Sequence, residues 1–97
     1  MGKAKKALEA FIDKIPASKL TGFSTSPGTI YSDDDFRLDM QKINNDKTHN
    51  LQIQANKQSS ITSVKGLAPK TVAGPVSAKS DADAETVRTA FKNKILI

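Results

Sequence analysis

Cysteine and tryptophan are both absent from this 97-residue chain, and its aromatic residues are only four Phe and one Tyr. Without cysteine the chain can form neither a disulfide nor a cysteine-based zinc site. With so few large side chains, it has little material for a core of its own. Length and composition therefore predict a single unit over residues 1–97 that gains order from a partner, and not a compact globular domain.

Long apolar runs are missing as well. No stretch approaches the roughly 20 apolar residues that a membrane-spanning helix needs. The basic start from Lys3 to Lys6 is not followed by the apolar region of a signal peptide. These absences predict a cytoplasmic protein that does not act at membranes.

Acidic residues are absent from Leu51 to Lys79, within a chain whose net charge is +5. Isolated aliphatic residues in this stretch are separated by Gly and Pro, which interrupt both helices and strands. We expect residues 56–79 to form an extended strap that lies along a partner.

The N-terminal segment has the spacing of an amphipathic helix. Leu8, Phe11 and Ile15 fall on one face of a helix over residues 3–15, and Pro16 ends the pattern. A helix of this length is marginal alone in water, so its apolar face needs a surface to cover it.

A second helix is predicted over 81–95, within a C-terminal unit at 80–97. Ser80 and Asp83 form a capping-box pattern at its start. Its apolar face consists of Val87, Phe91 and Ile95.

The chain between these helices is mixed in character. Residues 17–31 are rich in Ser, Thr, Gly and Pro, as linkers are. A central element follows over 32–55, and the strict alternation of apolar and polar residues from 50 to 55 predicts a short strand.

The first part of this central element is ambiguous. A capping pattern that includes Asp35 favours a helix over 33–43. The strand alternative rests on the alternation of Phe36, Leu38 and Met40.

Together these patterns predict a mainly α chain with long extended or irregular segments. It would contain short helices at 3–15, 33–43 and 81–95 and one strand at 50–55. A small α+β domain is the alternative.

Signals for catalysis or metal binding are weak. His49 is the single imidazole, and its polar neighbours place it in a solvated loop. The acidic run from Asp33 to Asp35, with Asp39, lacks the spacing of a calcium-binding loop and fits charge at a helix start. No phosphate-binding glycine pattern is present. We expect no enzyme activity, no catalytic or metal-binding residue and no cofactor.

Lysine residues make nucleic-acid binding an alternative function, because they neutralise phosphates without reading sequence. The residues concerned are Lys3, Lys5, Lys6, Lys57, Lys65 and Lys70. The chain has only two Arg, and no aromatic residues interleave with the lysines, so base stacking is unsupported.

The chain begins Met1-Gly2-Lys3-Ala4-Lys5-Lys6-Ala7 and finishes Ile95-Leu96-Ile97. This start resembles that of small basic virion or tail-assembly proteins of short-tailed, T7-like bacteriophages, which are similar in length and finish on short aliphatic tails. The resemblance implies a non-enzymatic structural protein that lines or joins larger virion components. Such a protein would be in the host cytoplasm during assembly and in the virion afterwards.

The sequence thus predicts a structural or interaction protein that docks, in multiple copies, on a larger protein assembly. Apolar side chains would occupy grooves of the partner or extend its sheet. These side chains are Leu8, Phe11, Ile15, Leu51, Ile53, Val87, Phe91 and Ile95. The alternative is a nucleic-acid-binding accessory protein, and the second alternative is a small inhibitor or regulator of an enzyme.

Overall fold

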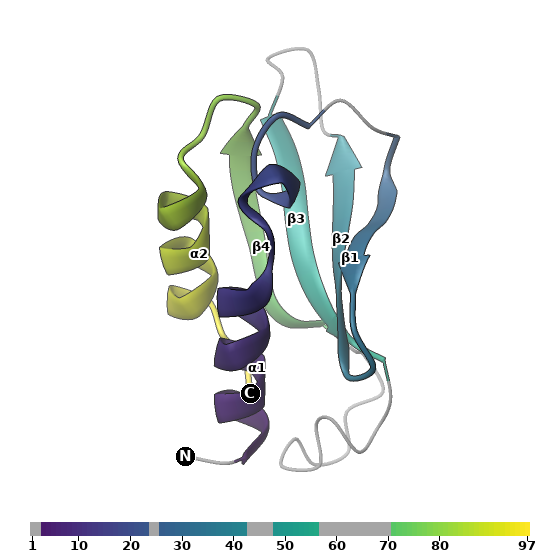
Figure 1. Cartoon of the computed structure of the whole chain (residues 1–97), viewed down its shortest axis with the longest axis vertical. Coiled ribbons are helices and arrows are strands. Elements are labelled where there is room, and N and C mark those ends of the chain that lie inside the picture. The colour runs from purple at the N-terminus through teal and green to yellow at the C-terminus, as the bar shows by residue number, and fades with distance from the viewer. Residues whose placement is uncertain (1–2, 24–25, 43–47, 57–70) are drawn as a thin grey trace.

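A four-stranded antiparallel sheet organises the part of the chain that the computed structural model describes, which comprises residues 3–23, 26–42, 48–56 and 71–97. In chain order the elements are α1 (Lys3–Lys14), the 3-10 turn η1 (Ala17–Lys19), β1 (Gly28–Ser32), β2 (Phe36–Lys42), β3 (Thr48–Ala55), β4 (Thr71–Lys79) and α2 (Ala84–Asn93). The strands lie in the order β1-β2-β3-β4, and both helices lie on one side of the sheet (Figure 1).

The first helix forms where its apolar residues recur at helical spacing. Leu8, Phe11 and Ile12 are buried beneath it. The ring centroid of Phe11 lies 5.5 Å from that of Tyr31 and 5.6 Å from that of Phe36, so α1 packs directly on the sheet. The helix predicted over 3–15 is confirmed.

The second helix begins at Ala84, later than predicted, because Asp83 is its N-cap. The Asp83 carboxylate accepts a hydrogen bond from the backbone N–H of Thr86 at 3.2 Å, which satisfies one of the free donors at the helix start. Val87 and Phe91 then turn towards the sheet and are buried. The helix predicted over 81–95 is confirmed with shorter bounds.

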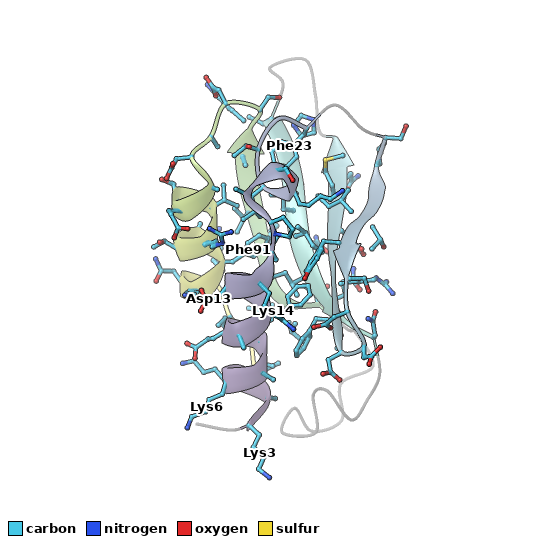
Figure 2. The ribbon with its side chains drawn as sticks, viewed as in Figure 1. Lys3, Lys6, Asp13, Lys14, Phe23 and Phe91 are labelled. Atoms are coloured by element: carbon cyan, nitrogen blue, oxygen red, sulfur yellow. The ribbon has the colours of Figure 1, made fainter. Side chains whose placement is uncertain are left out.

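Two contacts join the helices to each other across most of the sequence. Lys92 donates a hydrogen bond from Nζ to Oδ1 of Asp13 at 2.7 Å, and Arg88 donates from Nη2 to the backbone oxygen of Ile15. Asp13 lies on the side of α1 that faces α2 (Figure 2). The two helices therefore form one layer over the sheet.

The helix predicted over 33–43 is wrong, because this region forms the turn after β1 and then β2. The Asp33 carboxylate accepts hydrogen bonds from the N–H groups of Asp35 and Phe36, at 2.8 and 2.9 Å, and so closes a turn instead of capping a helix. The alternation that begins at Phe36 then matches a strand with one buried face. Pairing with strands on both sides decides between the two periods.

The predicted strand at 50–55 is confirmed and is longer, because β3 pairs along its length with β2 and β4. β4 was not foreseen, since residues 71–79 fell within the predicted strap. Its alternation is hidden by two register shifts, opposite Leu51 to Ile53 and Ile53 to Gln54. Residues 57–70 of that strap lie outside the described residues.

Gly74 lies at the first of these register shifts, where the backbone geometry requires glycine. Its φ is +114°, which L side chains rarely adopt, and an added Cβ would lie 3.0 Å from the backbone oxygen of Leu51. Only glycine therefore fits where β4 passes this close to β3.

The prediction of a mainly α, non-compact chain is wrong. The Cα radius of gyration is 12.8 Å, close to the roughly 13 Å of a folded domain of about 100 residues. One core between the sheet and the helices contains residues of both helices and of β2, β3 and β4. It includes Leu8, Phe11, Ile12, Ile15, Leu20, Phe36, Leu38, Met40, Leu51, Ile53, Val72, Val76, Val87 and Phe91. The α+β alternative describes the architecture, and the predicted linker at 17–31 contains η1 and most of β1.

Candidate functional site

The face of the sheet turned away from the helices carries polar side chains, and no described element covers it. We call it the open face. Register places these side chains in three rows that cross the strands. The rows are Ser32, Arg37, Gln54 and Thr71; Thr29, Asp39 and Gln52; and Gln41, Asn50 and Ser77. The period of two that buries one side of each strand therefore builds this polar surface on the other.

A hydrogen-bonded cluster lies on the β1–β2 side of the open face. Asp39 accepts from Oγ1 of Thr29 at 2.7 Å and from Nε of Arg37 at 3.1 Å. The Arg37 and Asp39 side chains are 40% and 24% exposed, so their charges are only partly screened by solvent. The cluster places one cation and one anion side by side, with polar groups left to contact a partner.

A hollow of about 320 Å³ lies beside this cluster. Its wall runs from Gly28 and Thr29 at the sheet edge, across Asp39 and Gln41, to the amide side chains of β3. Amide side chains both donate and accept hydrogen bonds, so the hollow suits a polar ligand or a polar protein surface.

A second hollow, of about 280 Å³, lies on the helix side of the same edge. It is lined by η1, by the chain around Phe23, and by Thr29 and Ile30 of β1. Phe23 and Ile30 are half-buried and give this otherwise polar hollow an apolar wall. Thr29 lines both hollows, so the β1 edge runs between them.

The apolar residues predicted to dock on a partner belong instead to the chain's own core. Seven are buried, namely Leu8, Phe11, Ile15, Leu51, Ile53, Val87 and Phe91. Ile95 packs against the core and is half-buried. In this fold none of these side chains forms an exposed docking surface, because the sheet and helices cover one another.

Only three of the six lysines predicted for nucleic-acid binding lie within the described residues. Lys3 and Lys6 are exposed on α1 (Figure 2). Lys5 is half-buried. Lys57, Lys65 and Lys70 lie outside the described residues. The described lysines of the predicted set thus lie on the helical layer, away from the open face.

His49 is a core residue and not the solvated loop residue that its polar neighbours indicated. It is 3% exposed, lies on the core side of β3 and has its ring 4.8 Å from that of Phe23. Its Nδ1 has no hydrogen-bond partner within the described structure. A buried imidazole covered by an aromatic ring is poorly placed to reach a substrate.

The Asp33 carboxylate in the acidic turn binds backbone N–H groups of that turn and the ammonium group of Lys14 in α1. Burial raises the pKa of Asp33, but hydrogen bonds from the N–H groups of Phe36 and Asp35 and the charge of Lys14 outweigh it, so the pKa lies below its usual value. Within the described ranges, no three potential ligand side chains are close enough to hold a metal ion.

No protein-family model matches the sequence, and no curated protein and no solved structure matches it significantly. No helix among the described residues is long and apolar enough to cross a membrane. The arguments for function therefore rest on the geometry of the open face and of the β1 edge.

The open face has a signal in the sequence, namely the polar residues that alternate with the buried ones in β2 and β3. Asn50, Gln52 and Gln54 alternate with the apolar residues of β3, and Arg37 and Asp39 do the same in β2. Attention to the apolar half of each alternation locates the core, whereas the polar half locates the exposed surface.

Proposed function

We propose that this protein is a non-enzymatic interaction module that docks on a larger protein assembly through the open face. The observation that carries the proposal is the set of three polar rows on a sheet face that no described element covers. Docking by the surface of a folded domain replaces the strap mechanism, since residues 71–79 form β4 and the apolar helix faces are buried.

The chemistry of the open face favours a polar protein partner. Arg37 and Asp39 balance each other in charge, and the surrounding amides offer donors and acceptors in equal measure. A surface of this kind makes wet, hydrogen-bonded contacts, with water molecules filling mismatches. The partner surface would expose polar side chains, with an acid or base opposite the Arg37–Asp39 pair.

The size of the open face bears on the strength of docking. Strands about 4.8 Å apart that rise about 3.4 Å per residue give the four strands, of 5, 7, 8 and 9 residues, an area of roughly 500 Å². A stable interface buries roughly 800 Å² on each partner. Docking through the open face alone would be reversible, unless many copies bind together or a neighbouring surface adds contacts.

The resemblance of the N-terminal residues to virion proteins of T7-like bacteriophages supports a virion as that assembly. Many copies of one small module on a repeating surface would compensate for weak single contacts. The protein would then pass from the host cytoplasm into the particle.

Nucleic-acid binding is the second candidate function, and the exposed Lys3 and Lys6 favour it. Neither has an ion pair within the described residues, whereas Lys14 and Lys92 are paired with aspartates. Binding of this kind weakens steeply as salt rises. Absence of DNA or RNA binding at moderate salt would remove this candidate.

Site-specific photocrosslinking tests the docking proposal. Gln52 at the centre of the open face is replaced by p-benzoylphenylalanine, and Thr89, exposed on α2, is replaced in a matched control. In cells that make the whole assembly, we expect one dominant adduct from position 52, lost on adding Arg37→Glu, and none from position 89. Equal adducts from both positions, or none from position 52, would contradict docking through the open face.

A further inference from the structure

The two edges of the sheet differ in how far the chain's own backbone covers them. Along β4, the N–H of Gly74 donates to the oxygen of Lys94 at 3.1 Å, and the N–H of Leu96 donates to the oxygen of Val72 at 2.8 Å. The N–H of Gly22 donates to the oxygen of Ser80, just beyond the end of β4, at 2.7 Å. The β4 edge is therefore occupied near both ends by the chain's own backbone.

The β1 edge has no such cover among the described residues. β1 pairs only with β2, and no described segment forms a ladder along its outer side (Figure 1). Unpaired N–H and C=O groups on an edge strand are a template for another strand. The pairing of Thr29 with Asp39 and of Tyr31 with Leu38 leaves Ile30 as an extra residue, which bends the edge.

Both hollows adjoin this edge, one on each face of the sheet. The helix-side hollow contains Phe23 and Ile30, the open-face hollow contains Asp39 and Gln41, and Thr29 borders both. Successive side chains of a strand point to opposite faces. A strand added beside β1 would therefore direct alternate side chains towards one hollow and then the other.

We propose that β1 accepts an extended segment of the partner protein as a fifth strand. Its side chains alternate between apolar ones, which fill the helix-side hollow against Phe23 and Ile30, and polar ones, which bond to the open-face amides. Lys19 lines the helix-side hollow, is exposed and has no ion pair within the described structure, so the segment carries an acidic residue at that point. This inference rests on the proposed docking role and supplies contact area that the open face alone lacks.

A second copy of this chain fits the edge less well than a foreign strand does. Two-fold pairing sets the same patch on both sides of the contact. Two β1 edges would bring hollow against hollow and Lys19 towards its own symmetry mate, with no side chain to fill either space. The shape and charge of the edge thus favour a partner with its own protruding side chains.

Selection of peptides followed by backbone methylation tests strand addition. A randomised library of ten-residue peptides is selected against the immobilised full chain, and affinities of the selected peptides are measured by fluorescence anisotropy. Each peptide is then made with N-methyl groups on its odd or on its even residues. An added strand directs alternate N–H groups at β1, so one methylated form should lose about tenfold or more in affinity while the other keeps most of it.

Two further measurements locate the site. Amide hydrogen exchange of residues 28–32 should slow on peptide binding. Lys19→Glu should weaken acidic peptides about fivefold, whereas Lys6→Glu, an exposed lysine on α1, should not. No selected binder, equal loss from both methylated forms, or slowed exchange confined to strands other than β1 would each overturn the inference. Such a failure leaves the crosslinks from position 52 intact, whereas failure of the docking proposal removes them.

Discussion

Lys14 in the last turn of α1 and Asp33 in the turn after β1 form an ion pair, with 3.1 Å between Nζ and Oδ2. The pair joins the helical layer to the turn that connects β1 and β2. Nearby, Phe11 packs on Tyr31 and Phe36, so a polar and an apolar contact fix the same corner of the fold. The position of β1 beside both hollows depends on this corner.

The Lys14–Asp33 pair predicts a specific dependence of stability on pH. The pKa of Asp33 is lowered from 3.8 because the hydrogen bonds from Phe36 and Asp35 and the charge of Lys14 outweigh burial. A carboxyl group of this kind adds stability that is present above its unfolded pKa and is lost as pH falls through its folded pKa. Urea unfolding between about pH 2 and 7 should show a shallower acid loss for Asp33→Asn than for wild type. Asp34→Asn, at the exposed neighbouring position, is the matched control for the loss of one charge, and an equal effect of both substitutions would contradict a specific role for Asp33.

The contribution of Lys14, the other member of the ion pair, to stability changes at alkaline pH. The pKa of Lys14 is raised from 10.5, first by its hydrogen bond to Asp33 and then by the charge of that carboxylate. Its contribution is complete below 10.5 and disappears as pH rises through the folded pKa. Lys14→Gln should therefore flatten the alkaline decline in the urea midpoint, and an unchanged alkaline profile would show that the pair does not persist in solution.

Phe91 tests the assignment of the apolar helix faces to the core. The side chain is 0% exposed, and truncation of a buried Phe costs about 3–5 kcal/mol. Phe91→Ala should lower the urea midpoint by a corresponding amount, whereas Thr89→Ala on the exposed side of α2 should change stability by less than about 0.5 kcal/mol. Equal, small effects of both substitutions would mean that α2 does not pack on the sheet.

Substitutions at two glycines distinguish the stability cost of backbone strain from that of steric crowding. Gly22 has φ of +64° and open space around an added Cβ, whereas Gly74 has φ of +114° and the backbone oxygen of Leu51 at 3.0 Å. Gly22→Ala should cost about 1 kcal/mol, as expected for a left-handed residue. Gly74→Ala should cost at least about 2 kcal/mol more, measured by urea unfolding, because β3 and β4 must move apart. A smaller loss at Gly74 than at Gly22 would contradict the described approach of these strands.

The isolated chain should unfold in one cooperative step. A single core joins both helices to the sheet, and no part of it is separate enough to melt alone. Calorimetry should give a van't Hoff enthalpy equal to the calorimetric one, with the midpoint independent of protein concentration. A broad transition, or two enthalpies that differ widely, would show that the fold requires a partner.

The helices were predictable from the sequence because their signals are local. The spacing from Leu8 to Ile15 and the capping pattern of Ser80 and Asp83 lie within single segments, although the structure places the cap at Asp83 itself. The strand at 50–55 was predictable for the same reason, since its alternation is unbroken.

The sheet was not predictable because its strands depend on pairing between distant segments. At Phe36 the helical and strand periods coincide, and only the neighbours β1 and β3 decide between them. In β4 the register shifts around Gly74 remove the alternation that would have revealed a strand. The docking residues were mispredicted for the same reason, since a residue can be assigned to the surface or to the core only when the sheet is known.

The contacts between α1 and α2 constrain how the protein is made. The Arg88 guanidinium and the Ile15 carbonyl are 73 residues apart in sequence, and Lys92 and Asp13 are 79 apart. A ribosome would synthesise α1 long before its partner helix, so these two contacts would form only after the hairpins have emerged. The helical layer is therefore completed only when nearly the whole chain has been made, and chains stalled before α2, which lack the buried Val87 and Phe91, are the form most exposed to chaperones and proteases.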